Sequence, residues 1–429
     1  MFVRALLIAA IAFTVGCEKT DHENIERWMH TAKGPAKLRQ ALSDGAIDPD
    51  LSAHAAAGLI KRGDDQAAWT ALSTMAPARR AQVVGRLAPR LWEIARLEND
   101  TDLPGALQVV AKDALVRIRP WADDAGRQQI DGYLIDWYCV ASFEDRAKAG
   151  ANLGPAVMRL VGPAAARKLM TVANGVIAAP GQGKTRNAIG SNLLLGLAAT
   201  GSPDAVKYVL DIARMDRGDP TLARRAMSAL YVAYVEPNGE FPVTDRQALL
   251  PDLPAIVEVA KDDAQDPRAA NDAVALIRAV GAPHCLAPLV GMIGAPHRNA
   301  QFKFVIANNA LKCGGTQAIL EVVRALPDAG AYAKDQVTGG ISGEIARMTP
   351  RDQAQAQARA LLAETSTVAR WVGMEALTAM KSTDDAPAIA ALGTSRERLV
   401  GYWGEHAEGK EDPTLGQRAR ELSAVLRGK

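Results

Sequence analysis

The sequence has few aromatic residues, almost no net charge and a single long apolar run. Its 429 residues include only 7 Trp, 7 Tyr and 6 Phe. Large β-barrels and propellers rely on aromatic and β-branched residues, so this composition argues against them. A net charge of +2 gives no electrostatic basis for binding nucleic acid. With 48% apolar and 23% charged residues, the chain is too apolar for a disordered protein and too polar for a protein with many membrane spans.

Sequence motifs of common enzymes are also missing. The chain has no G-x-S-x-G elbow, no S-x-x-K pair and neither H-E-x-x-H nor H-x3-H. His284, Cys285 and His297 lie close in sequence, but a zinc site needs a fourth ligand that the sequence does not offer. We interpret the six histidines as solvated or core-edge residues. The sequence therefore predicts no metal site and no catalytic residue.

One segment imitates a nucleotide-binding loop. Residues 178–185 satisfy a relaxed phosphate-loop pattern that ends in Gly183-Lys184-Thr185. Ala178 replaces the first glycine. The residues before it have the pattern of a helix, whereas a true phosphate loop follows a buried strand. We interpret the segment as a loop in which Thr185 caps the next helix, so we expect neither nucleotide nor cofactor.

The one long apolar run lies at the N-terminus and has the form of a secretory signal. Arg4 precedes the apolar stretch 5–15, which is too short to stay in a bilayer as a permanent helix. The stretch ends in Thr14-Val15-Gly16-Cys17, which resembles the bacterial lipobox, where small residues precede an acylated cysteine. Thr14 departs from the Leu that is usual at that place in the motif.

The lipobox resemblance implies that 1–16 is a cleaved lipoprotein signal peptide and that Cys17 carries acyl chains such as palmitate. Several chains together give stable anchoring. Glu18 stands where an Asp would retain an enterobacterial lipoprotein at the inner membrane. We therefore expect an outer-membrane lipoprotein that faces the periplasm or the cell surface, with 17–30 as a short tether. An ordinary signal peptide, or a buried helix with an incidental cysteine, is the alternative.

Three cysteines remain after Cys17. Cys139, Cys285 and Cys313 form no C-x-x-C pair. An oxidising compartment permits a disulfide between Cys285 and Cys313. We nevertheless expect all three to be single buried cysteines that pack as small hydrophobic residues.

What the sequence has in abundance is a recurring pair of Ala- and Leu-rich helices. Each first helix ends at a short turn with Gly, Pro or Asp, and a second helix with apolar residues three and four apart follows. The recurrent helix is predicted to begin near residues 185, 221, 269, 299, 334, 367 and 415. The mean interval of about 38 residues is typical of two-helix repeats. Residues 51–72 are a further copy, and 75–150 hold less regular helices.

These units resemble HEAT repeats, in particular the HEAT-like repeats of phycobilin lyases, over 180–400 and less closely over 35–72. The resemblance implies an all-α fold, an α-solenoid (α-α superhelix) of stacked two-helix HEAT-like repeats in which neighbours bury each other's apolar stripes. We expect irregular helical repeats over 31–150 and a HEAT-like array over 151–429. With the lipobox, the chain resembles HEAT-repeat lipoproteins of predatory or social soil bacteria.

Polar residues return near the start of the recurrent helices. They are Arg186, Asn187, Asn192, Arg224, Arg225, Arg268, Asn271, Arg298, Asn308, Asn309, Arg370 and Trp371. One interpretation is a structural ladder in which each Arg meets a loop Asp such as Asp219 or Asp266. The other is a recognition strip for a protein partner, with Trp371 and Trp403 as surface anchors.

The sequence thus favours a non-enzymatic, lipid-anchored scaffold that binds protein partners at the bacterial cell envelope. Its membrane contact would be the lipid anchor, and it would bind neither nucleic acid nor nucleotide. A HEAT-like lyase-type enzyme or pigment-handling protein is one alternative, and it would need a reactive Cys or an acid pair. A purely structural envelope spacer is the other.

Overall fold

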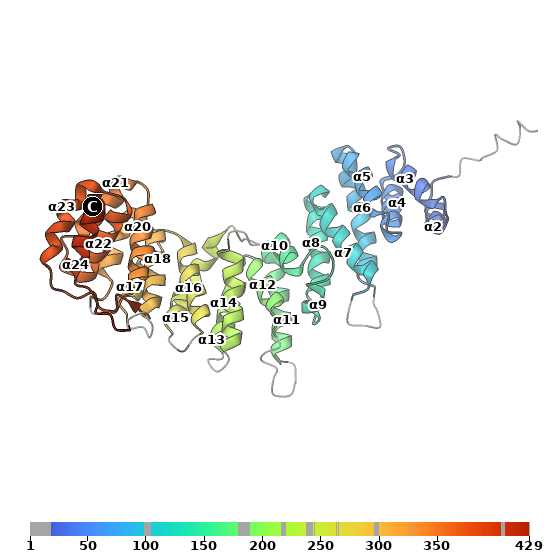
Figure 1. The fold of residues 1–429 in the computed structure, drawn as a ribbon. Helices are drawn as coiled ribbons and strands as arrows, with labels where there is room; N and C mark the ends of the chain where they lie inside the picture. The colour runs from blue at the N-terminus through green and yellow to red at the C-terminus, as the bar shows by residue number, and fades with distance from the viewer. Residues whose placement is uncertain are drawn as a thin grey trace, which may run out of the picture. The chain divides into compact units, whose positions relative to one another are not determined.

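The computed structural model is helical in every regular element that it describes (Figure 1). It describes residues 19–97, 104–178, 189–215, 220–236, 243, 245–262, 264, 266–295, 300–328, 330–404 and 408–428. No strand occurs in these ranges, which confirms the predicted all-α solenoid of helices packed in series. The signal peptide and Cys17 lie outside them. None of the described helices combines the length and the apolar character that crossing a membrane requires.

The chain divides into two compact units, residues 1–196 and 197–429. The division falls inside α12 (Ser191–Ala199) and not at the predicted boundary after residue 150. Helices on both sides of residue 150 pack together, since α10 contacts α8. The elements of unit 1 before α12 are α2 (His22–Met29), α3 (Gly34–Ser43), α4 (Pro49–Lys61), α5 (Asp65–Thr74), α6 (Pro77–Ala95), α7 (Ala106–Ile118), η1 (Arg119–Trp121), α8 (Asp124–Tyr138), α9 (Phe143–Arg146), α10 (Gly154–Val161), η2 (Gly162–Ala165) and α11 (Ala166–Ala178).

The second unit continues the series from the end of α12. Its elements are α13 (Pro203–Met215), α14 (Pro220–Tyr234), η4 (Arg246–Asp252), α15 (Leu253–Lys261), α16 (Pro267–Val280), α17 (Leu286–Ile293), α18 (Ala300–Gly314), η5 (Gly315–Ala318), α19 (Ile319–Arg324), the π-helix η6 (Gln336–Ser342), α20 (Gly343–Arg347), α21 (Arg351–Leu361), α22 (Thr367–Ala379), η7 (Thr383–Asp385), α23 (Ala386–Ala391), η8 (Leu392–Thr394) and α24 (Leu415–Leu426).

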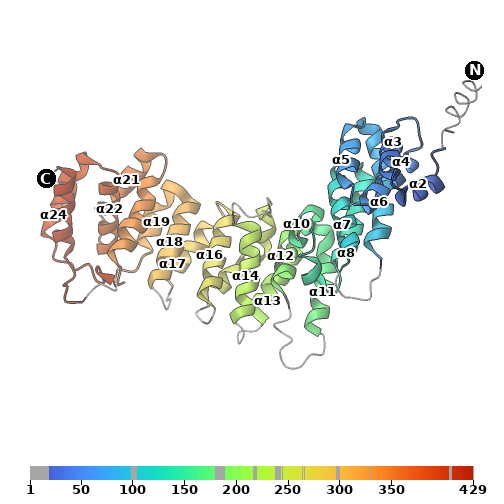
Figure 2. The same ribbon diagram turned by 45° about the vertical axis from the view of Figure 1, so that its right-hand side comes forward.

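Two rows of helices build the second unit. The first row runs α14, α16, α18, η6–α20, α22 and α24, and each helix packs on the next (Figure 2). The second row, α13, α15, α17, α19, α21 and α23, packs against the first. Every first-row helix is one of the recurrent helices predicted from the sequence. The repeat in the sequence is therefore the repeat of the packing.

Small residues let neighbouring helices approach closely. A side chain at Gly373 in α22 would meet the carbonyl oxygen of Ala358 in α21 at 2.8 Å. Alanines such as Ala269, Ala273 and Ala376 are fully buried at the contacts between helices. Close contacts of this kind leave little room for large rings, which accounts for the low aromatic count.

Local sequence signals set the helix ends. Asp123 caps α8 by accepting a hydrogen bond from the Gly126 N–H at 2.8 Å. Asp385 does something else, because it binds the side chains of Arg359, Gln355 and Ser382 and so joins α21 to the loop before α23.

The chain after η8 forms a loop whose two arms pair before α24 begins, since the N–H groups of Leu399 and Leu415 donate to the carbonyl oxygens of Pro413 and Glu397. We call residues 395–404 and 408–414 the C-terminal strap (Figure 1). The carbonyl oxygens of Val400 and Tyr402 accept hydrogen bonds from the backbone N–H groups of Tyr332 (2.9 Å) and Lys334 (2.8 Å). The Tyr402 ring stacks on Trp371 with 5.6 Å between ring centroids. The strap therefore covers Trp371 near the start of α22 and the residues just before η6.

Candidate functional site

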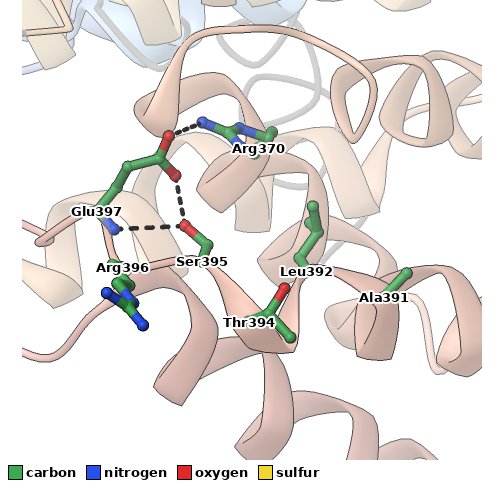
Figure 3. A pocket seen from close by; sticks show the side chains of 7 residues that line it. All are labelled: Arg370, Ala391, Leu392, Thr394, Ser395, Arg396 and Glu397. Carbon is green, nitrogen blue, oxygen red and sulfur yellow. Dashed lines mark hydrogen bonds and ion pairs between the residues drawn. The ribbon is translucent and has the colours of Figure 1, made fainter.

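A polar pocket lies where the strap leaves α23 and η8 (Figure 3). Its volume is about 610 Å³. It is lined by Arg370, Ala391, Leu392, Thr394, Ser395, Arg396 and Glu397. Arg370 comes from the first turn of α22. The other lining residues come from the end of α23, from η8 and from the first residues of the strap.

Glu397 is the centre of the pocket's hydrogen bonds. It accepts from the Ser395 hydroxyl and from Arg370 Nη2 at 2.8 Å (Figure 3). Together these two donors hold the pKa of Glu397 below its usual range. A carboxylate with a lowered pKa is a weak base, so Glu397 cannot efficiently activate Ser395 as a nucleophile. The chemistry of the pocket suits binding better than catalysis.

Several of the predicted ladder residues are used within the chain. Asn192 donates to Glu144 at 2.9 Å, and the same carboxylate accepts the Leu193 N–H at 2.8 Å, which fixes the start of α12. Arg370 is held by Glu397 and by the Thr365 carbonyl oxygen. Arg225 and Asn309 donate to carbonyl oxygens four residues earlier in their own helices. These four side chains bind groups of the chain itself.

Trp371 is not a surface anchor, so that prediction is wrong. Its side chain is 1% exposed, stacks on Tyr402 and donates to Glu375 at 3.1 Å. The strap that buries it follows about 30 residues later, so the polar sequence around Trp371 gave no sign of it. Trp403 on the strap is partly exposed, and the Lys410 ammonium lies 4.7 Å from its ring.

Other predicted ladder residues lie on the free side of the first row. A helix inside this row is covered by its two row neighbours and by the second row, which leaves one side open. On α14, α16 and α18 we call this side the open front. Arg224, Arg268, Asn271, Asp272 and Asn308 lie there, and no described side chain or backbone group is a partner of their side chains. Arg186, Asn187 and Arg298 lie outside the described residues.

Two groups on the open front are buried in part and have no partner among the described residues. Burial and the nearby Asp266 raise the pKa of Asp272 to about 6. The Oδ1 atom of Asn308 is buried and accepts no hydrogen bond. A partly desolvated carboxylate without a partner is unfavourable, and a bound molecule that supplied a donor to Asp272 would relieve it. The Asn308 Oδ1 atom is too deeply buried to be reached in this way.

The cysteines differ from the prediction of three separate buried residues. Cys285 and Cys313 form a disulfide that joins the start of α17 to the end of α18 across 28 residues. The interpretation of these two as unpaired is therefore wrong, and the pairing that the compartment permits is present. Cys139 is the free cysteine among the described residues. Burial raises the pKa of its thiol to about 12.

Sequence reasoning missed a chain of titratable side chains in the first unit. His22 contacts both Asp50 and His54, and His54 also contacts Glu26. His22 and Glu26 are four residues apart on α2, and Asp50 and His54 are four apart on α4. That spacing places each pair on one helix face, so the sequence itself indicated that the two side chains of each pair lie close together. The structure shows no group of three metal-ligating side chains among its described residues.

Comparisons with known proteins show no family for this chain. No family model matches it, and a search of curated proteins gave no match. Among solved structures, an engineered protein from the Northeast Structural Genomics Consortium aligns over 94% of this chain and 99% of its own, at 13% identity and a TM-score of 0.27. Human deoxyhypusine hydroxylase, solved in complex with glycerol, aligns over 81% and 96%, at 15% identity and a TM-score of 0.25. Scores this low carry no argument about activity.

Proposed function

We propose that the protein is a non-enzymatic helical-repeat scaffold that binds protein partners on the open front of α14, α16 and α18. The observation that carries the proposal is the set of polar side chains there that lack partners among the described residues. The same row is covered by the strap at α22, whereas these three helices present Arg224, Arg268 and Asn271 outward. Arg and amide side chains are strong donors for the carbonyl and carboxylate groups of a protein partner.

The binding test is crosslinking and affinity capture of the full chain in its own membranes. We expect a reproducible partner that the double variant Arg224→Ala/Arg268→Ala captures at least about tenfold less well, since truncating an anchoring Arg costs about 1–2 kcal/mol. The matched control is Arg159→Ala/Arg167→Ala, which removes two exposed arginines from α10 and α11. Equal capture by both double variants would contradict the proposed surface.

We also propose that acyl chains on Cys17 anchor the scaffold to the bacterial outer membrane. The support is the lipobox resemblance alone. Cys17→Ser should move the protein from the membrane fraction to the soluble fraction, because the acyl chains would be the membrane contact. A variant that stays with the membrane would overturn the anchor without touching the partner surface.

The enzyme alternative depends on a reactive thiol or on a carboxylate that can act as acid or base. Cys285 and Cys313 are joined to each other, and the raised pKa of Cys139 leaves almost no thiolate at neutral pH. Maleimide labelling of the folded protein at pH 7 should therefore be slow at Cys139 and fast after denaturation. Fast labelling of Cys139 in the folded protein would support the lyase-type alternative. A spacer would show no specific partner in the capture experiment.

A further inference from the structure

Two histidines and two carboxylates form a continuous chain between α2 and α4. His22 Nε2 lies 3.2 Å from Asp50 Oδ2, and the Nδ1 atoms of His22 and His54 lie 2.9 Å apart. His54 Nε2 lies 2.7 Å from Glu26 Oε1. The order is therefore carboxylate, imidazole, imidazole, carboxylate. His22 and Glu26 belong to α2, whereas Asp50 and His54 belong to α4. Each of the three side-chain contacts therefore joins the two helices.

The number of protons on the two rings decides whether this chain is intact. Each outer ring nitrogen needs a hydrogen to donate to its carboxylate. The central contact needs one hydrogen between the two Nδ1 atoms, because one nitrogen must donate and the other accept. Three hydrogens on four ring nitrogens therefore satisfy all three contacts, and the pair then carries one positive charge. A fourth hydrogen places two N–H groups against each other at 2.9 Å, and the central bond is lost.

The surroundings make a second positive charge unfavourable. His54 is 6% exposed, and burial lowers its pKa, with the Arg90 guanidinium on α6 acting in the same direction. Arg90 also occupies both oxygens of Asp50, at 3.1 and 3.0 Å. The hydrogen bond from His54 lowers the pKa of Glu26, and so do the nearby charges of Lys61 and His30. Glu26 and His22 on α2 and Arg90 on α6 are the titratable and charged side chains that act on His54.

We propose that this chain is a proton-sensitive clasp that holds the first described helix, α2, against α4 and releases it when both imidazoles become charged. The clasp goes beyond the proposed function and does not depend on it. Beside it, α2 is held by Ile25, Trp28 and Met29 in the core and by a hydrogen bond from Arg62 to the Met29 carbonyl oxygen. Apolar contacts and that bond do not respond to mild acid. The clasp is thus the part of the α2 contact that protons can open.

The direction of the pH effect follows from the lowered pKa values of His54 and Glu26. A histidine with a lowered pKa binds fewer protons when docked than when free, so its docking weakens as the pH falls through and below the ordinary histidine pKa of about 6.5. A glutamate with a lowered pKa stabilises the docked state above its ordinary pKa, and that stabilisation is lost on further acidification. Two hydrogens leave one contact unmade, three complete the chain and a fourth breaks it, so the clasp is complete only over an intermediate pH range. The lowered pKa values of His54 and Glu26 predict that acid beyond that range opens it.

A metal ion is the other occupant that two facing imidazoles suggest. The carboxylates lie on the outer nitrogens, so an ion between the Nδ1 atoms would have two protein ligands, and the described residues supply no third. Structural zinc sites use four ligands and catalytic ones three. The shared proton therefore accounts better for the arrangement.

The test is amide hydrogen exchange of residues 25–29 in the full chain between pH 8 and pH 5, corrected for intrinsic exchange. We expect protection of α2 to be highest where the pair holds three hydrogens and to fall toward pH 5 as the fourth is added, by at most about tenfold per pH unit, while α6 stays protected. His22→Asn should remove this fall. The exposed asparagine amide can turn either its donor or its acceptor toward His54, so charging His54 no longer breaks the contact.

His284→Asn is the control, because it removes an exposed imidazole that belongs to the second unit and takes no part in the contacts between α2 and α4. It should keep the parent pH profile. His54→Asn should be flat in pH even if its overall protection is lower, which separates loss of the switch from loss of packing. The proposal fails if His22→Asn retains the acid response, if the parent shows none, or if Zn²⁺ at pH 7.5 increases protection only when both histidines are present.

Discussion

Lys112 and Asp272 show at the scale of single residues why burial alone does not mark a functional group. Lys112 is fully buried, but its ammonium donates to Asp113 Oδ1 (2.6 Å) and to the carbonyl oxygens of Ala149 and Asn152 (both 2.9 Å). All three of its donors are used, so it holds a loop to α7. Asp272 has no such partners among the described residues. It is the less buried of the two, yet it has more to gain from a bound molecule.

Replacing Asp272 by Asn should stabilise the second unit at neutral pH. The native carboxyl has a pKa of about 6 and the unfolded one about 3.8, so the folded state binds more protons between these values. Stability therefore falls as the pH rises from 4 to 6, and the penalty is fully present above 6. Allowing for solvent screening, we expect Asp272→Asn to add about 1 kcal/mol at pH 7 and nearly nothing at pH 4.

Urea denaturation at several pH values measures this difference. Asp352→Asn, which removes an exposed carboxylate on α21, is the control and should show no such trend. The free energy of unfolding gained by Asp272→Asn should differ between pH 4 and pH 7. An equal gain at both would mean that the surroundings do not destabilise the ionised carboxylate.

At the scale of elements, the Cys285–Cys313 disulfide fastens two helices of the array. It joins α17 to α18 and so ties one helix of the second row to its partner in the first. Near the end of the chain, an ion pair serves the same purpose. Glu375 in α22 accepts from Arg418 Nε at 2.7 Å and from Nη2 at 3.1 Å, and this pair joins α22 to α24.

Removing the disulfide should destabilise the second unit. Closing 28 residues restricts the unfolded chain, and the entropic account gives about 3.6 kcal/mol for a loop of this size. Cys313→Ser and reduction of the parent with dithiothreitol should lower stability equally, and dithiothreitol should have no further effect on Cys313→Ser. Cys139→Ser is the control that changes a thiol without opening a loop. Equal stability of reduced and oxidised parent would refute the structural role of the bridge.

At the scale of the whole molecule, the two compact units have separate cores. Repeat arrays gain stability from neighbouring repeats, and long ones do not unfold in one step. We expect hydrogen exchange in increasing urea to give distinct midpoints for α4–α8 and for α16–α18. Cys313→Ser should shift the midpoint of α16–α18 alone. A common shift in both regions would show that the units unfold together.

The fold could be predicted from sequence because its signals are local and recur. The spacing of Ala, Leu and Gly set the first-row helices, and each was found close to its expected start. The site could not be predicted in the same way. Asn192 meets Glu144 from 48 residues away, and Trp371 is buried by a strap that follows it. Such pairings depend on tertiary packing, which local sequence context does not encode.

The strap also ends the proposed partner surface on one side. Packed helices lie about 8–10 Å apart, so the open front on α14, α16 and α18 spans about 20–30 Å before the π-helix and the covered α22. An extended peptide advances about 3.3 Å per residue. If the open front binds a partner as proposed, we therefore expect the bound segment to be a linear motif of about six to nine residues, or one exposed helix on a larger partner.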